Sequence, residues 1–235
     1  MKLYFVCFFY ILFNSLAVLA DEKATVPSIS TITEMAEEAV RKKIALEPNA
    51  KLIITPQDLS GRLVPPACYP PVKVELASDR EIGRNNTVRV SCDSPDYDYP
   101  WQIFLSVRVE IMYPVVVANE ILSPDSVISP EQLNIEYLDQ YSLRGRFFSD
   151  LNAVIGTKTK RRINKGNPIL SNHLCFVCKG DGVSIYAKSH NLQIKTVGEA
   201  LRDGNIGDTI RVKNSNSNRE LEATVIGIGE VEVRM

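Results

Sequence analysis

The sequence predicts an α+β protein that is mostly β, with one helix near its N-terminus. Three observations predict this class: one segment with helical apolar spacing, several runs with strand-like alternation, and regular glycines in the C-terminal third. The 235 residues are more than one small domain needs. We expect a signal peptide (1–20), a helix-plus-sheet domain (21–112), a second β domain (113–174) and a small β-barrel-like domain (175–235).

The first twenty residues, "MKLYFVCFFYILFNSLAVLA", have one lysine followed by a dense apolar run that ends in Ala20, just before Asp21. This pattern predicts a secretory signal peptide that is cleaved after Ala20. A retained anchor helix is the alternative, because the run approaches the length of a membrane span. The polar pair Asn14–Ser15 interrupts the run and favours cleavage. We therefore expect a mature chain outside the cytoplasm, without membrane insertion.

The cysteines fit an oxidising compartment. Cys7 leaves with the signal peptide, which leaves Cys68, Cys92, Cys175 and Cys178. An even number of cysteines in an exported chain suggests disulfides, and four cysteines allow three connectivities. Sequence position favours pairing of neighbours, Cys68 with Cys92 and Cys175 with Cys178.

In the first domain, Thr31 and Glu34 match a capping box at the start of an amphipathic helix, and Pro48 is expected to end it. The apolar residues with helical spacing are Ile32, Met35, Ala36, Ala39, Val40 and Ile44. Alternating runs predict antiparallel strands at 51–55, 72–76, 86–92 and 101–112.

Tyr113–Pro114 is interpreted as the joint to the second domain, because Pro114 fixes the backbone and the strand "VVVA" follows at once. We expect the first domain to swing about this joint relative to the two C-terminal domains, which pack together. Gly156 and Gly166 mark turns in the second domain.

Short strands separated by turn signals predict a small closed or nearly closed barrel in the third domain. Its punctuating glycines are Gly182, Gly198, Gly204, Gly207, Gly227 and Gly229. The stretch "NSNSN" is a polar loop, and "VGEALRDG" is compatible with one helical turn.

The strongest chemical candidate is "CFVC", Cys175 to Cys178. Such a pair is a redox couple, half of a zinc site, or a local disulfide. A zinc site would need His173 and His190, whose spacing matches no familiar zinc pattern, so we favour the structural reading. Neither histidine has an obvious nucleophile or base partner. We expect no enzyme activity, no metal and no cofactor.

The charge pattern argues against nucleic acid, since 27 basic and 28 acidic residues give a net charge of −1. One local basic run is formed by Lys158, Lys160, Arg161, Arg162 and Lys165. A nucleic acid, an anionic lipid or an acidic partner would suit it. Basic residues that blunt an edge strand explain it without any ligand.

The segment "EYLDQYSLRGRFFSDLN" concentrates aromatic residues beside Arg144 and Arg146. These residue types dominate protein–protein hot spots. The candidate partner-binding residues are Tyr137, Tyr141, Arg144, Phe147 and Phe148. The alternative is that the rings fill a small core. We expect at least one ring to be exposed, facing a cleft between the first and second domains.

Two stretches of the second domain, "VVVANEILSPDSVISPEQL" and "IGTKTKRRINKGNPIL", resemble a SAF (β-clip) module. Ile128 and Leu133 take the apolar positions of its first half. The second half is matched by Gly156, Ile163, Gly166, Pro168 and Ile169. Asp125 stands where glycine is common and Gln132 where an acid is common, so the resemblance specifies the turn less firmly than the module.

The third domain resembles the C-terminus of the flagellar basal-body P-ring formation protein family. The matching residues are Gly180, Val183, Ala200, Leu201, Gly204, Gly207, Ile210, Val212, Asn214, Ser217, Val225 and Val231. The family also has a signal peptide and an N-terminal helix-plus-sheet domain, often with a cysteine pair and a tryptophan, as Cys68, Cys92 and Trp101 stand here. "CFVC" lies outside the family pattern.

The resemblance implies a periplasmic assembly chaperone that binds P-ring subunits and promotes P-ring assembly around the flagellar rod. A pilus-assembly or cell-wall-binding protein with the same β-clip is the alternative. Enzymes that carry SAF-like modules also have a large catalytic domain, for which this chain offers no candidate. Self-association is left open.

Overall fold

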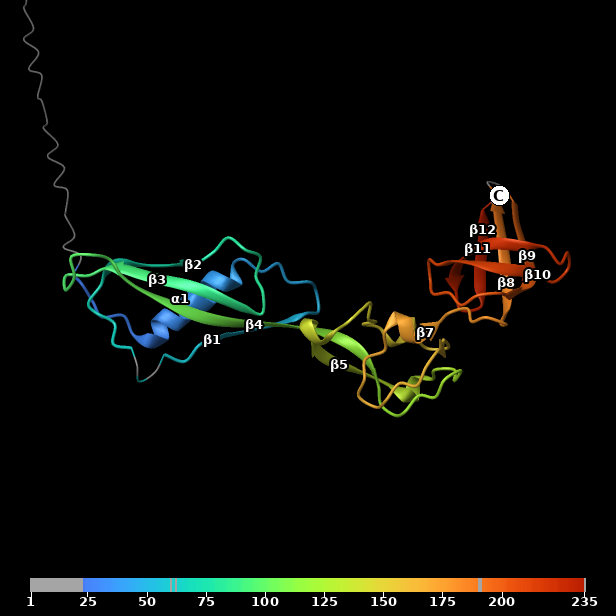
Figure 1. Cartoon of the computed structure of the whole chain (residues 1–235), viewed down its shortest axis with the longest axis horizontal. Coiled ribbons are helices and arrows are strands. Elements are labelled where there is room, and N and C mark those ends of the chain that lie inside the picture. The colour runs from blue at the N-terminus through green and yellow to red at the C-terminus, as the bar shows by residue number, and fades with distance from the viewer. Residues whose placement is uncertain (1–22, 60, 62, 190–191, 235) are drawn as a thin grey trace, which may run out of the picture. The chain divides into compact units, whose positions relative to one another are not determined.

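The computed structural model describes residues 23–59, 61, 63–189 and 192–234 (Figure 1). The expected signal peptide, its cleavage site at Ala20, and His190 lie outside the described residues. The chain divides into two compact units, with one boundary between Val107 and Arg108. Each unit is described by itself.

The helix α1 (Ile29–Arg41) begins earlier than the sequence predicts. Ser28 is its N-cap, and the Ser28 side-chain oxygen accepts a hydrogen bond from the Thr31 N–H at 3.0 Å. The expected capping box at Thr31 and Glu34 is therefore wrong, because Ser28 already satisfies an orphan donor of the first turn.

The end of α1 also differs from the prediction, since Pro48 does not terminate it. Lys42 is the C-cap, and the Lys43 N–H bonds to the Val40 carbonyl, three residues back. This tighter last turn satisfies a terminal carbonyl before the proline is reached. The buried face of the helix is formed by Ile32, Ala36 and Val40.

The main sheet has the strand order β1-β4-β3-β2. These strands are β1 (Lys51–Pro56), β2 (Tyr69–Leu76), β3 (Asn85–Asp93) and β4 (Trp101–Ala118). Strands β2, β3 and the first part of β4 belong to the first unit, whereas residues 51–55 of β1 and 108–118 of β4 belong to the second. Alternate side chains of β3 and the first part of β4 are buried, which gives the sheet one core face. Helix α1 packs on β2 and β3 (Figure 1).

Strand β4 runs through Tyr113–Pro114 without a break, so the prediction that a new strand begins there is wrong. Val116 and Ala118 donate their N–H groups to Phe148 and Asn167, away from the neighbouring strand β5 (Leu133–Asp139). Pro114 lies two residues before Val116, so its backbone nitrogen faces the same edge of the strand, away from β5. Its missing N–H therefore removes nothing from the β4–β5 ladder, which makes the proline compatible with a continuous strand.

Residues 113–174 of the second unit, which resemble a β-clip and are called the β-clip from here on, contain mostly short strands and 3₁₀ turns. Its regular pieces are η1 (Pro130–Gln132), η2 (Gln140–Ser142), η3 (Leu151–Ala153), β6 (Lys158–Thr159), η4 (Ser171–His173) and β7 (Leu174–Cys175). Isolated bridges, such as Leu122 with Ile163 and Val117 with Pro168, satisfy much of the remaining backbone. Its core is built from Val116, Ala118, Leu122, Ile128, Leu133, Val154, Ile163, Ile169 and Leu174.

The β-clip motif residues have structural roles. Ile128, Leu133, Ile163 and Ile169 are all buried in this core. Asp125, which stands where glycine is common, has φ of 60°. Aspartate is one of the few residues other than glycine that visit the left-handed region readily, so the turn keeps its geometry despite the substitution.

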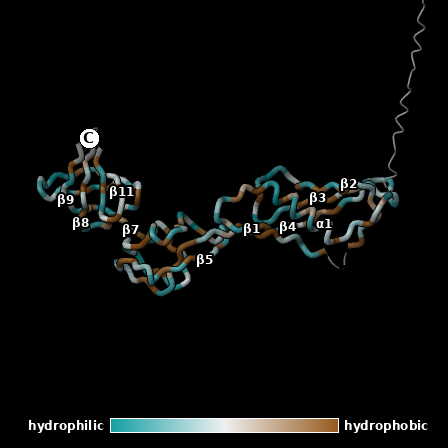
Figure 2. The backbone as a smooth tube through the Cα atoms, turned by 180° about the vertical axis from the view of Figure 1, so that it is seen from behind, coloured by the Kyte–Doolittle hydropathy of each residue, from teal (hydrophilic) through white to brown (hydrophobic). Residues whose placement is uncertain are grey.

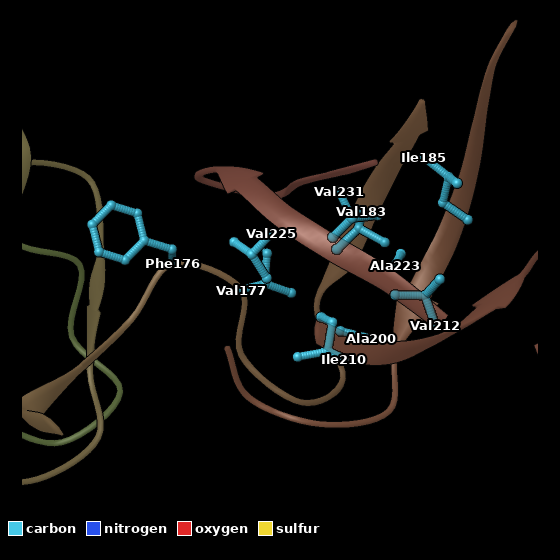
Figure 3. Packing of buried hydrophobic residues seen from close by; sticks show 10 residues of the cluster. All are labelled: Phe176, Val177, Val183, Ile185, Ala200, Ile210, Val212, Ala223, Val225 and Val231. Atoms are coloured by element: carbon cyan, nitrogen blue, oxygen red, sulfur yellow. The ribbon is translucent and has the colours of Figure 1, made fainter. Parts of the chain in front are cut away.

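The predicted barrel is confirmed and it is closed, with the strand order β10-β11-β12-β8-β9. The strands are β8 (Gly182–Ser189), β9 (Leu192–Ala200), β10 (Thr209–Asn214), β11 (Glu220–Gly227) and β12 (Glu230–Arg234). All pairs are antiparallel except β12 with β8. Figure 2 shows apolar and polar residues mixed along these strands, and Figure 3 shows the buried cluster that fills the barrel.

The helical turn expected in "VGEALRDG" is wrong, because β9 continues through Ala200. Ala200 pairs with Val212 of β10, and the tertiary pairing overrides the local helix preference. No helix among the described residues is both long and apolar enough to cross a membrane.

Gly204 fastens the segment before the barrel to the barrel itself. Its carbonyl accepts hydrogen bonds from Phe176 and Val177, and its own N–H donates to the Val177 carbonyl at 2.8 Å. A Cβ at this position would lie 2.7 Å from Ile210 Cγ2 and 2.9 Å from Val225 Cγ2. The close approach therefore requires a residue without a side chain.

The structure places Cys68 and Cys92 at disulfide distance, with Cα atoms 5.7 Å apart and a sequence separation of 24 residues. We predict that replacing both by serine lowers the free energy of unfolding of the first unit by about 3 kcal/mol, because the open chain gains loop entropy. Urea unfolding checks the loss, and mass spectrometry of the non-reduced protein checks the link. Free alkylation of both thiols would contradict the pairing.

Candidate partner-binding surface

The predicted partner-binding segment starts on strand β5, which lies at the edge of its sheet. Among the described strands, β5 pairs with β4 alone. Four consecutive residues, 134–137, are exposed, so side chains on both faces of the strand are accessible. Ile135 is 41% exposed and Tyr137 is 38% exposed. An open edge with accessible apolar side chains can add a strand from another chain.

Tyr137 is held in place by a cation–π contact. The Lys51 Nζ lies 3.5 Å from the centroid of the Tyr137 ring, and both residues belong to the second unit. A contact of this kind at an exposed site is worth about 0.5–1 kcal/mol. The contact orients the ring and leaves part of its surface available to a partner.

Tyr141 and Arg144 follow in a turn organised by Asp139. The Tyr141 N–H donates to Asp139 Oδ1 at 3.2 Å, and the Ser142 hydroxyl donates to the Asp139 carbonyl at 2.6 Å. Tyr141 is 45% exposed, and Arg144 is exposed as well. The turn therefore presents a ring and a guanidinium to solvent.

The two phenylalanines lie deeper than the tyrosines. The Phe147 ring is half-buried, with its centroid 5.6 Å from that of Tyr113. Phe148 packs against both the β-clip core and the barrel core, and its ring centroid is 6.5 Å from that of Phe176. Of the five predicted residues, Tyr137, Tyr141 and Arg144 are placed at the surface, whereas Phe148 joins two cores.

The "CFVC" pair forms a tight local loop. The sulfur atoms of Cys175 and Cys178 are at disulfide distance, with Cα atoms 5.3 Å apart. His173 is buried near this loop, and its Nδ1 accepts a hydrogen bond from the Leu170 N–H at 3.3 Å. In the part of the chain that the structure describes, no three histidine, cysteine or acidic residues form a metal-sized cluster.

Two lysines of the basic run form ion pairs. Lys158 Nζ is 2.5 Å from Asp181 Oδ1, and Lys160 Nζ is 3.6 Å from Asp203 Oδ2. Both acids belong to the C-terminal domain. Each pair is partly exposed and contributes at most about 1 kcal/mol, so the pairs help to orient the β-clip on the barrel without dominating its stability.

Sequence patterns did not identify Lys51 and Ile135 as members of this surface. Lys51 is remote in the chain, and only the fold places its ammonium over Tyr137. Ile135 belongs to an ordinary strand pattern, and its exposure follows from the edge position of β5. A count of strands in the sheet would have been needed to find it.

The fold defines the class: a mostly β protein with one N-terminal helix and a closed barrel in its C-terminal region. Family models identify the family. Residues 113–233 match the family described as "Chaperone for flagella basal body P-ring formation", and residues 32–111 match the FlgA N-terminal domain. The chain belongs to this family of P-ring formation chaperones.

Relatives and solved structures are similar to this chain at low identity. The flagellar protein FlgA of Agrobacterium fabrum is 26% identical over 113 residues, which are 47% of this chain and 70% of the relative. That of Rhizobium meliloti is 26% identical over 121 residues, 50% and 72% respectively. The crystal structure of Salmonella FlgA in open form has a TM-score of 0.47 at 15% identity, over 88% and 92%. FlgA from Thermotoga maritima has a TM-score of 0.47 at 20% identity, over 88% and 73%.

We predict that Phe148→Ala lowers the free energy of unfolding of the second unit by about 2–3 kcal/mol, somewhat less than for a fully buried phenylalanine. The reason is that the ring contacts two cores. Tyr141→Ala is the matched control and is expected to change stability by less than about 1 kcal/mol. Urea unfolding measures both. Equal, small effects would contradict the assignment of Phe148 to the core.

Burial lowers the pKa of His173, and the charge of Arg161 adds to this effect. The unfolded chain therefore binds a proton at a higher pH than the folded chain. We predict that stability is highest above the unfolded pKa of about 6.5 and is lost as the pH falls from there through the folded pKa. His173→Gln should flatten this loss in urea midpoints measured from pH 8 to pH 5. If His173→Gln has the same pH profile as the wild type, His173 is not the cause of the loss of stability.

Proposed function

We propose that this chaperone works in the periplasm, where it binds P-ring subunits and promotes their assembly around the flagellar rod. Membership of the P-ring formation family supports the process. The observation that carries the binding step is the open β5 edge, which continues into the exposed turn with Tyr141 and Arg144. The expected signal peptide supports the compartment.

The chemistry of this surface suits an extended polypeptide. The backbone of an edge strand offers hydrogen bonds to any sequence, whereas neighbouring side chains select the partner. Ile135 and Tyr137 supply apolar area, and Arg144 supplies a charge. Binding of this type requires no reactive group. The swing about Tyr113–Pro114, and a cleft that closes on the subunit, stay predictions, which solution scattering with and without the subunit tests.

The test is binding of purified P-ring subunit to the wild type and to Tyr137→Ala, Tyr141→Ala and Arg144→Ala. We expect at least one variant to bind about tenfold more weakly, as removal of a hot-spot side chain costs more than 1 kcal/mol. Swimming of cells that carry each variant should fall in parallel. Circular dichroism checks folding.

Tyr99→Ala is the matched control, because this tyrosine is 68% exposed in the first unit and outside the proposed surface. It should bind and swim normally. Folded variants that all bind like the wild type would remove this surface from the mechanism. Capture of a pilus component or of cell-wall glycan, with no affinity for the P-ring subunit, would favour the alternative function.

A further inference from the structure

A pocket of about 260 Å³ lies within the second unit, where the β-clip meets the barrel. Phe148 and Phe176 line it, and their ring centroids are 6.5 Å apart. Figure 3 shows Phe176 apart from the side chains inside the barrel, on the side of the β-clip ribbon. The pocket therefore has an aromatic wall that both domains build.

Two isoleucines of the C-terminal domain are the accessible part of the lining. Ile206 is 53% exposed and Ile228 is 47% exposed, and both belong to loops between barrel strands. Two large aliphatic side chains beside an aromatic wall leave apolar area in contact with water. Covering such area is favourable by about 25 cal/mol per Å².

The walls are held by hydrogen bonds, one of them between the two domains and one within each, so the pocket exists before any ligand arrives. Asn205 Nδ2 donates to the Ser171 carbonyl at 2.9 Å, and the Ser171 N–H donates to the Arg146 carbonyl at 2.9 Å. The Asn205 N–H bonds to Asp208 Oδ2 at 2.9 Å. A preformed pocket costs little ordering entropy on binding.

Arg146 makes the pocket positively charged. Among the residues that line it, Arg146 is the one with an ionised side chain, and its guanidinium forms no ion pair within the described residues. Asp208 does not line the pocket, and its Oδ2 accepts a hydrogen bond from the Asn205 N–H. An acidic group beside an apolar group complements this arrangement.

We propose that this pocket receives one large apolar side chain of a P-ring subunit, with an acidic residue of the same segment against Arg146. The inference rests on the proposed function and adds a second contact to it, apart from the β5 edge. Aromatic and aliphatic anchors in desolvated pockets are the usual hot spots.

The first experiment measures P-ring subunit binding to full-length Ile228→Ser, Ile206→Ser and Arg146→Glu. Each should bind about tenfold more weakly than the wild type. The matched controls are Ile194→Ser, an equally exposed barrel isoleucine, and Arg219→Glu, an exposed arginine, both outside the pocket. Controls and pocket variants with the same affinity as the wild type would overturn the inference, and the proposed function would stand.

The second experiment does not depend on the subunit. The peptides acetyl-Phe-Glu-amide and acetyl-Phe-Lys-amide are titrated into the ¹⁵N-labelled protein. The first should shift amide resonances of residues 146–153, 204–207 and 227–228, and both the lysine peptide and Ile228→Ser should reduce its affinity at least about fivefold. Absence of these shifts overturns the pocket. Shifts without subunit binding in the first experiment would support the pocket and reject the proposed function.

A second copy of this chain is the competing occupant, and sedimentation equilibrium decides it. A monomer at all concentrations supports the inference. A concentration-dependent dimer that Ile228→Ser abolishes would assign the pocket to self-association and overturn it.

Discussion

The second half of strand β4 is the constraint on which the β-clip and its surface depend. Residues Val115–Ala118 are completely buried, one after another, because both edges of the strand are hydrogen-bonded and both faces are covered. On one edge β5 supplies the partners, and on the other Phe148 and residues 166–169 do so. A strand that is buried in this way cannot shift its register without exposing apolar side chains. It therefore fixes where β5 lies, and with it the open edge.

Much of the fold could be predicted from the sequence, because the side chains that are buried follow the periodicity of the apolar residues. The alternation in 86–92 and 101–112 matches buried Val88, Val90, Leu105 and Val107. Glycine spacing predicted the barrel, and the β-clip motif predicted a core. The errors were local. Ser28 caps α1, although Thr31 matches the capping-box pattern better. Glu199 and Ala200, which favour a helix, belong to strand β9 because Ala200 pairs with Val212.

The candidate surface was predictable in composition but not in exposure. Tyr137, Tyr141 and Phe148 look alike in the sequence, yet Phe148 joins two cores and the tyrosines reach solvent. Which ring is buried depends on the open edge of β5 and on the contact between the β-clip and the barrel. Both arise from contacts between residues far apart in the chain, such as Lys51 with Tyr137 and Phe148 with Phe176. Local sequence patterns do not predict such contacts.

The parallel pairing of β8 with β12 has a kinetic consequence. Glu230 lies beside Ser184, so the barrel closes across more than forty intervening residues. Non-local closure of this kind is slow, because loop entropy is lost before the contacts form. Until residues 230–234 pair with β8, this strand has one unpaired edge next to valines of the future core. The last domain of this chaperone is thus itself exposed to mispairing during its own folding.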